Sequence, residues 1–158
     1  MFPIKVHFVI VGEANGDDAI TYYETLQDMV THSQFESRFH FVGFQKDISA
    51  VMSVIDILAV PSTKETFGRV AVEGLAACCA VVASDTGRFP EIITDQNNGI
   101  LVPLNDPEML YQSIRKLAFD QSLRDHLTKN GFDSVKRFDV NHHVEQTQSL
   151  YDTVLNEN

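Results

Sequence analysis

The chain has 158 residues, of which 44% are apolar and 22% charged, and its formal net charge is -10. This size and composition fit one globular domain with a buried core. The negative charge argues against a nucleic-acid partner, because phosphate backbones are bound by basic surfaces. No apolar run reaches the roughly 20 residues of a membrane-spanning helix, and we interpret the N-terminal segment as a strand rather than a signal peptide.

The only cysteines, Cys78 and Cys79, are adjacent. Adjacent cysteines rarely form a disulfide, since the bond needs a wider Cα separation than one peptide gives comfortably. With no other cysteine in the chain, a structural disulfide or a cysteine-based zinc site is not expected. These observations favour a reducing, cytoplasmic location.

Apolar runs and capping residues predict alternating strands and helices. Asp17 and Asp47 are expected to cap the first two helices, Gly68 precedes the third, and Asp106-Pro107-Glu108 begins the next. Gly131 is expected to weaken the helix after that. The expected strands are 4–12, 38–44, 56–62, 80–84 and 99–103, and the expected later helices include 122–137 and 140–155.

This alternation predicts an α/β fold in which parallel βαβ units carry helices on both faces of a sheet. We assign residues 1–158 to a single domain, because no linker or repeat interrupts the pattern. Ligands of such sheets bind beyond the carboxyl ends of the strands. The loops 12–17, 43–47, 61–68 and 84–91 are therefore the candidate walls of a site.

Two glutamates, Glu65 and Glu73, flank the expected start of the helix that follows Gly68. The first N–H groups of a helix lack internal partners and can bind phosphate oxygens, and Gly68 would let a ligand approach the backbone. The two carboxylates could accept hydrogen bonds from sugar hydroxyls beside such an anion. The alternative is a helix whose first acid complements the helix dipole and whose second acid is solvated.

The run "VPSTKETFGRVAVEGLAACCAVVASDTGRFPEIITDQNNGILVP" contains Pro-Ser, Glu, Phe-Gly, a second Glu, Pro-Glu and Asn-Gly in that order. It resembles the signature of retaining glycosyltransferases of family 4, also called glycosyl transferases group 1. Similarity continues in "VIVGEANG" and in the final helix around "VEQTQSLYDTVL". The resemblance implies the C-terminal, donor-binding half of a GT-B fold, with a Rossmann-like parallel sheet.

The resemblance also implies a role for each matching residue. Glu73 would hold the ribose hydroxyls of a nucleotide sugar, and Glu65, as the catalytic residue, would contact the hydroxyls of the donor sugar. The backbone at Phe67, Gly68 and Arg69 would face the diphosphate and the sugar. Gln45 and Asp47 would meet the base, although Asp47 has a plain helix cap as its alternative role.

Three positions depart from the family pattern: Cys78 and Ala80 replace a Gly and a Pro, and Arg88 replaces the second Gly of a Gly-Gly turn. We expect the first two to affect packing, and Arg88 either to be solvated or to assist phosphate binding. The first strand of the donor domain, with its Arg and Lys, has no counterpart here. We therefore expect an interrupted sheet, a fragment of a two-domain enzyme, and no sugar transfer by this chain alone.

The implied reaction moves a hexosyl unit from a UDP- or GDP-sugar to an acceptor glycan or lipid-linked sugar, which an N-terminal domain would bind. No metal and no cofactor are expected, because the sequence lacks an Asp-x-Asp motif, and His142-His143 are expected at the surface. The implied location is cytoplasmic, with peripheral membrane contact through the acceptor half. The alternatives are a non-catalytic nucleotide-sugar-binding module and a sugar-nucleotide 2-epimerase; base, sugar, acceptor and oligomeric state stay open.

Overall fold

The computed structural model describes residues 6–156. Contacts divide the chain into two compact units, Met1–Val51 and Met52–Asn158; the assignment of all 158 residues to one domain stays a prediction. In chain order the elements are β1 (Phe8–Val11), α1 (Asp17–Thr31), η1 (Glu36–Arg38), β2 (Phe39–Gly43), α2 (Ile48–Met52), β3 (Ile57–Val60), α3 (Arg69–Ala76), β4 (Ala80–Ser84), α4 (Phe89–Ile92), β5 (Ile100–Val102), α5 (Pro107–Phe119), α6 (Gln121–Ser134), η2 (Val135–Phe138) and α7 (Val140–Asn156).

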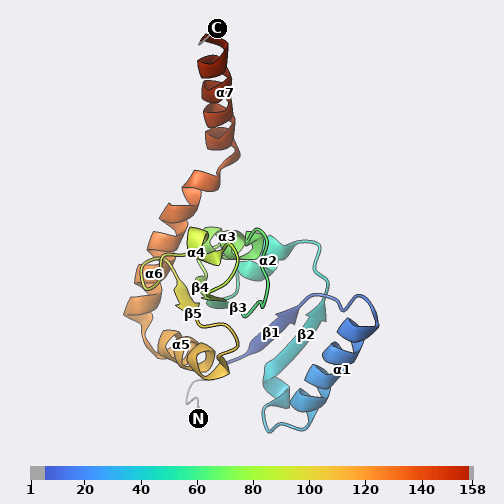
Figure 1. The fold of residues 1–158 in the computed structure, drawn as a ribbon. Helices are drawn as coiled ribbons and strands as arrows, with labels where there is room; N and C mark the ends of the chain where they lie inside the picture. The colour runs from blue at the N-terminus through green and yellow to red at the C-terminus, as the bar shows by residue number, and fades with distance from the viewer. Residues whose placement is uncertain (1–5, 157–158) are drawn as a thin grey trace. The chain divides into compact units, whose positions relative to one another are not determined.

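The five strands form two parallel sheets, β1–β2 and β3–β4–β5 (Figure 1). The expected α/β class with parallel strands is confirmed. Within residues 6–156 the strands pair only inside these two sheets, and the interruption expected from a missing first strand stays a prediction. Part of the strand expected at 4–12 lies outside the described residues; the described strand begins at Phe8.

The first unit is a two-stranded sheet covered on one face by α1. Phe8 and Phe39 pair across the strands with their rings stacked 4.6 Å apart, and Tyr23 of α1 meets Phe41 edge-on at 5.4 Å. On the opposite face His7 and His40 share a 2.9 Å hydrogen bond between Nδ1 and Nε2. None of the described residues of this unit is buried, because two strands and one helix enclose too little space.

The second unit has β4 at the centre of its sheet, and all five residues of that strand are buried. Because strand side chains alternate between faces, Val81 and Ala83 pack toward α3 and α4, with Leu75 and Phe89. Ala80 and Val82 pack toward α5 and α6. Helices on both faces of a parallel sheet thus enclose two apolar clusters, as the sequence predicts.

Aspartate caps mark the starts of α5 and α6. The Oδ1 atoms of Asp106 and Asp120 accept hydrogen bonds from the N–H groups of Met109 and Leu123, both at 2.9 Å. The expected cap by Asp17 is wrong: Gly16 precedes α1, and no side chain caps this end. Gly16 has a positive φ of 89°, a conformation that glycine adopts easily, and α1 begins directly after it without an aspartate cap.

Helix α6 runs through Gly131, and the weakening expected there stays a prediction. A Cβ at this position would lie 2.7 Å from Cδ2 of Leu75 in α3, so the glycine permits close contact between the two helices. The helix ends at Ser134, and residues to Phe138 form the 3₁₀ turn η2. Close packing outweighs the cost of roughly 1 kcal/mol that glycine brings to a helix interior.

The buried Asn98 joins three segments of the second unit. Its Nδ2 donates to the carbonyl oxygen of Ile92 at 3.1 Å and to Oγ of Ser134 at 2.9 Å. Its Oδ1 accepts from the N–H of Thr94 at 2.7 Å. Both polar atoms of this amide have partners, so it ties the loop before β5 to the end of α6 without an unsatisfied buried polar atom.

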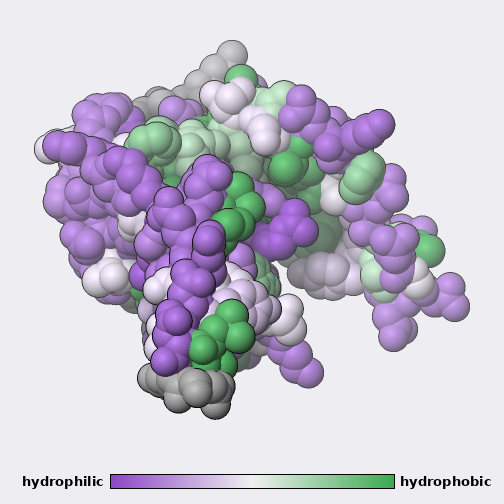
Figure 2. Space-filling model, turned by 90° about the horizontal axis from the view of Figure 1, so that it is seen from above, coloured by the Kyte–Doolittle hydropathy of each residue, from purple (hydrophilic) through white to green (hydrophobic). Residues whose placement is uncertain are grey.

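Helix α7 has no buried residue. Val144, Leu150 and Val154 are among its exposed apolar side chains, and Figure 2 shows such side chains in green among hydrophilic ones. Within the part of the chain that the structure describes, no helix is long and apolar enough to cross a bilayer.

Candidate functional site

The loop between β3 and α3 folds back on itself through Glu65. Oε1 of Glu65 accepts hydrogen bonds from the N–H groups of Phe67 at 2.9 Å and Gly68 at 2.8 Å. Gly68 has a left-handed backbone (φ 79°) and directly precedes α3. The carboxylate therefore fixes the turn that leads into the helix, a role that the sequence did not predict.

These hydrogen bonds lower the pKa of Glu65, the bond from Phe67 most and that from Gly68 next, against a smaller opposing effect of burial. Hydrogen bonds to a carboxylate stabilise its charged form. Glu65 thus stays ionised near neutral pH and suits hydrogen-bond acceptance rather than proton donation. The N–H of Thr66 also contributes to the lowering, by a smaller amount.

The N-terminus of α3 offers fewer backbone donors than the sequence suggests. The N–H groups of Phe67 and Gly68 are taken by Glu65, and those of Ala71 and Val72 bond the carbonyl oxygen of Gly68. Within residues 6–156, this leaves the N–H groups of Arg69 and Val70 without a partner. Two N–H groups and the helix dipole still favour an anion at this end.

Gly68 packs against α4 on the side where a Cβ would lie, and its expected role in letting a ligand approach the backbone stays a prediction. A Cβ at Gly68 would lie 2.4 Å from Cδ1 of Ile92 in α4, so the residue is covered by protein. Its glycine character serves the left-handed turn and the contact with α4. Phe67, by contrast, is 66% exposed and presents an aromatic ring beside the turn.

Glu73 lies on α3, one turn after Arg69. Its Oε1 pairs with Nη2 of Arg69 at 3.1 Å, and the Glu73 side chain is 36% exposed. Arg69 is 78% exposed, so the pair is held weakly and a ligand could displace it. The structure brings Glu65, Phe67, Gly68, Arg69 and Glu73 together on one loop and the first turns of one helix.

Gly87 brings the loop after β4 against this site. It has φ 55°, and a Cβ there would lie 2.0 Å from the carbonyl oxygen of Glu65, which no side chain could tolerate. The next residue, Arg88, has an ordinary φ of -90°, so the second glycine of the family turn is not needed for the backbone. Arg88 pairs with Glu91.

The structure also shows the backbone conformation or hydrogen bonding at the other two positions that depart from the family pattern, Cys78 and Ala80. Cys78, in place of the usual Gly, keeps a left-handed backbone (φ 60°), which strains a residue with a side chain. Ala80, in place of the usual Pro, donates its N–H to the carbonyl oxygen of Asp56 at 3.0 Å. Cys78 is exposed and Ala80 is buried, and the expected effect of both residues on packing stays a prediction.

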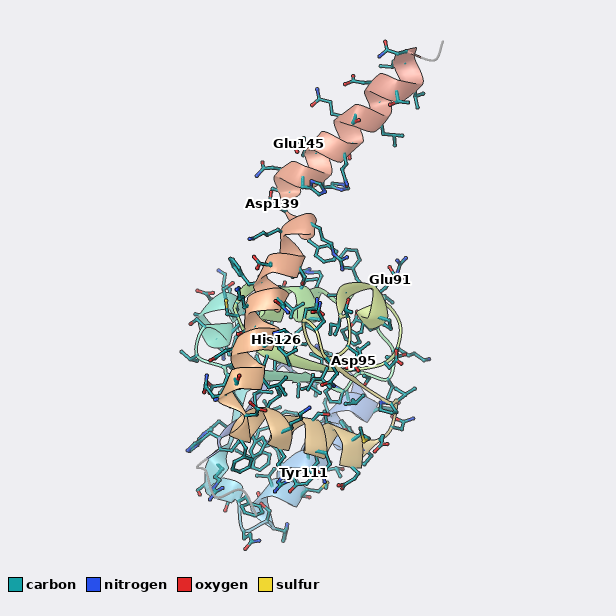
Figure 3. All side chains as sticks on the ribbon, turned by 90° about the vertical axis from the view of Figure 1, so that its left-hand side faces the viewer. Glu91, Asp95, Tyr111, His126, Asp139 and Glu145 are labelled. Atoms are coloured by element: carbon teal, nitrogen blue, oxygen red, sulfur yellow. The ribbon has the colours of Figure 1, made fainter. Side chains whose placement is uncertain are left out.

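A hollow of about 480 Å³ opens beside Phe67 in the second unit. This volume is in the range of sites for small molecules. Glu91 lies on α4 at the end of the unit from which α7 extends (Figure 3). The polar side chains of the hollow come from the Glu65 turn, α4 with the residue before it, η2 and α7, and they are Thr66, Arg88, Glu91, Arg137, His142 and Gln146.

Sequence reasoning missed Arg137 and Gln146 and placed His142 at the surface without a function. His142 is indeed exposed, yet it lines the hollow. Arg137 reaches the carbonyl oxygen of Glu91 across 46 positions of the chain, at 2.6 Å. Only the folded arrangement reveals this grouping, because no local motif connects these segments.

Gln45 and Asp47 lie together on a loop of the first unit, after β2. Nε2 of Gln45 donates to the carbonyl oxygen of Val42 at 2.6 Å. Oδ1 of Asp47 accepts from the N–H of Ala50 at 3.1 Å, so Asp47 caps α2. The alternative role given to Asp47 is therefore present in the structure, whether or not the residue also meets a base.

The loops after β1 and β2 form a second hollow, of about 370 Å³, within the first unit. It is lined by residues that include Gly12, Glu13, Tyr23 and Gly43. The hollow at the second unit uses the loops 61–68 and 84–91. Both hollows thus involve loops that the sequence marks as candidate site walls. Among residues 6–156, no three His, Cys, Asp or Glu side chains gather as metal ligands.

Known proteins match this chain over most of its length. Residues 3–134 match the family described as glycosyl transferases group 1. The chain is 29% identical over 157 residues to a D-inositol 3-phosphate glycosyltransferase of Corynebacterium glutamicum. The matched region covers 98% of this chain and 37% of that protein. The chain is 34% identical over 107 residues to a phosphatidyl-myo-inositol mannosyltransferase of Mycobacterium leprae, covering 67% and 29% respectively. The chain spans less than half the length of these relatives.

Solved structures give the same result for the fold. Anabaena HepE in complex with UDP superimposes with a TM-score of 0.85 at 29% identity, over 98% of this chain and 42% of HepE. A complex of HepE with UDP-glucose is also known. The C-terminal domain of LpcC from Francisella tularensis matches with a TM-score of 0.79 at 31% identity, over 85% of this chain and 70% of that domain.

Proposed function

This chain belongs to the glycosyl transferases group 1 and has the fold of the C-terminal half of a GT-B enzyme, and from this premise we propose that it is the donor-binding half of a retaining hexosyltransferase. The whole enzyme would move a hexosyl unit from a UDP- or GDP-sugar to an acceptor hydroxyl. The observation that carries the proposal is the Glu65 turn, in which two N–H groups hold a carboxylate ionised beside the start of α3.

Each residue at this turn is proposed to bind a different part of the donor sugar nucleotide. Oε2 of Glu65 accepts hydrogen bonds from hydroxyls of the donor sugar, because Oε1 is already used by the backbone. Glu73, released from Arg69, accepts hydrogen bonds from the two ribose hydroxyls. The N–H groups of Arg69 and Val70 face the diphosphate, where the positive end of the helix favours negative charge.

Catalysis in this proposal is mainly electrostatic. Fixed donors that face the departing diphosphate stabilise the charge that develops as the bond to the sugar breaks. Arg69, freed from Glu73 by the ribose, becomes available to the same charge. Gln45 and Asp47 of the first unit are proposed contacts of the base.

HepE, a relative of similar fold, is known in complex with UDP and UDP-glucose, which favours a UDP-sugar as the first donor to test. The acceptor would be a glycan or a lipid-linked sugar held by an N-terminal domain, in the cytoplasm or at the membrane surface. We also propose that these 158 residues alone transfer no sugar, so binding is the property to measure.

The test is a titration of the 158-residue chain with UDP, UDP-glucose, GDP and GDP-mannose, followed by NMR of its backbone amides. Glu73→Ala should weaken nucleotide binding by about 1.5–3 kcal/mol, the scale of hydrogen bonds to a charged group. Glu65→Gln should weaken UDP-glucose more than UDP, since its partner is the sugar. Glu108→Gln, on the exposed first turn of α5, is the matched control.

Three results would reject this assignment: no nucleotide bound at all, unchanged affinity in Glu73→Ala, or equal losses of UDP and UDP-glucose in Glu65→Gln. Transfer of sugar by the purified chain would reject only the statement that it is inactive alone.

A further inference from the structure

The hollow beside Phe67 has an excess of positive charge in a chain whose net charge is -10. Two arginines, Arg88 and Arg137, line it, and Glu91 is the only acid among its lining residues. One carboxylate cannot balance two guanidinium groups. Such a local excess attracts an anion even when the whole protein is negatively charged, since nearby charges dominate at short range.

Arg137 is held in place by two protein contacts, and Arg88 by one exposed ion pair. Nη2 of Arg137 donates to the carbonyl oxygen of Glu91 at 2.6 Å, and the group lies 4.8 Å from the centre of the Phe138 ring. Nη1 of Arg88 pairs with Oε2 of Glu91. A guanidinium carries five N–H donors, so each arginine retains donors for a ligand; Arg88, whose pair with Glu91 is exposed, is held less firmly than Arg137.

The other polar groups of the hollow suit the same kind of ligand. Thr66 offers a hydroxyl, Gln146 an amide and His142 a ring nitrogen, and all three can donate hydrogen bonds. The exposed ring of Phe67 adds an apolar wall. Arginine forks and neutral donors together match the oxygens of a phosphate or a carboxylate, and a ring wall matches the apolar face of a sugar.

We propose that this hollow binds a phosphate or carboxylate group carried by the acceptor substrate, an inference that rests on the proposed function. Thr66 lines the hollow and follows Glu65, the proposed contact of the donor sugar, so a ligand here lies beside the sugar to be transferred. Glu73, the proposed ribose contact, does not line the hollow. The nucleotide end of the donor and the anion of the hollow therefore occupy different places, and the acceptor class is an anionic sugar.

The experiment is an NMR titration of the 158-residue chain with glucose 6-phosphate. Glucose, which lacks the charged group, and inorganic phosphate, which lacks the sugar, are titrated separately as controls. Glucose 6-phosphate should shift the amides of Thr66, Arg88 and Arg137 and saturate, while glucose at the same concentration should not. Arg137→Gln should weaken this binding about tenfold or more, the value of one lost charge-assisted hydrogen bond. Arg88→Gln, which leaves η2 untouched, should weaken it similarly.

The matched control is Arg115→Gln. Arg115 also lies over an aromatic ring, 5.7 Å from the centre of Phe119, but it does not line the hollow. Its substitution should leave the affinity for glucose 6-phosphate unchanged. Equal effects of Arg115→Gln and Arg137→Gln, or equal binding of glucose and glucose 6-phosphate, would overturn the site.

A competition experiment shows whether the bound anion belongs to the acceptor or to the donor sugar nucleotide. Glucose 6-phosphate should still bind when UDP-glucose is saturating. Displacement of glucose 6-phosphate by UDP-glucuronate but not by UDP-glucose would show that the anion belongs to the donor sugar, and would overturn the acceptor assignment. If UDP fails to shift α3 while glucose 6-phosphate still shifts the hollow, the proposed function fails and the anion site stands.

Discussion

The two compact units bury very different amounts of their side chains. Among the described residues, every buried residue lies at Met52 or later, and β4 is buried throughout, whereas β1 and β2 have no buried residue. Both units follow the same βα pattern. The difference is that β4 has a strand on each side and helices on both faces, while the sheet of the first unit has two strands. The order of strands and helices in the sequence therefore does not show which unit contributes more to the free energy of unfolding.

The largest expected effect comes from the core of the second unit. Phe89 is fully buried, and Phe89→Ala should destabilise the unit by about 3–5 kcal/mol. Phe41→Ala in the first unit should cost about 1 kcal/mol, because Phe41 is only half-buried. Urea unfolding followed by circular dichroism measures both. Phe89→Leu serves if Phe89→Ala does not fold, and equal costs for Phe41 and Phe89 would show that burial does not distinguish the units.

Two glycines sharpen the comparison. Gly87 and Gly43 both have a left-handed φ, of 55° and 64°, but a Cβ would meet the Glu65 backbone only at Gly87 and would meet nothing within 4 Å at Gly43. Gly43→Ala should cost about 1–2 kcal/mol of backbone strain. Gly87→Ala should cost clearly more and should also shift the amides of Phe67 and Gly68 in NMR spectra. Equal losses of stability would mean that the loop moves away freely.

Cys78→Gly should change stability in the opposite direction. It removes a strained left-handed backbone (φ 60°) at an exposed position, and the gain should be about 1 kcal/mol in the free energy of unfolding. Cys78→Ser keeps the strain and is the control, so its stability should stay near that of the original chain. A gain in Cys78→Ser as large as in Cys78→Gly would assign the effect to the sulfur instead.

The smallest expected effect is a pH dependence that arises at the Glu65 turn. The pKa of Glu65 is lowered in the folded chain by its backbone hydrogen bonds, so its carboxylate adds stability at pH values above its ordinary pKa. That contribution should be lost as the pH falls from about 4.5 through the lower folded-state pKa. Thermal unfolding of Glu65→Gln between pH 6 and 3 should show a shallower decline than the original chain. Parallel curves would contradict the role of the turn.

Local chemistry decided which parts of the fold the sequence could predict. Asp106 and Asp120 head their helices because an aspartate cap needs only the next few residues. Asp17 misled the prediction, since the conformation of Gly16 determined the start of α1. The strands were predictable from apolar runs, although β3 and β5 are shorter than the runs 56–62 and 99–103 that predicted them.

The candidate site likewise has features that the sequence could predict and features that it could not. Its place at the loop before α3 followed from strand and helix order, and Glu65, Glu73 and Arg69 do lie together there. The use of Glu65 by the N–H groups of Phe67 and Gly68 depends on a left-handed residue, which sequence patterns do not specify. The contribution of Arg137 and Gln146 to the hollow depends on how η2 and α7 return to α4.

Asn98 has a chemical consequence beyond packing. Asparagine followed by glycine is prone to deamidation, in which the next backbone nitrogen attacks the side-chain amide to form a cyclic imide. Here the amide of Asn98 is buried and engaged by Ile92, Thr94 and Ser134, so the folded chain withholds it from that attack. Unfolding exposes it, and each deamidation then replaces the amide by a carboxylate that cannot donate to Ile92 and Ser134. Mass spectrometry of aged samples would therefore record, as a gain of about 1 Da at this peptide, how long the second unit has spent open.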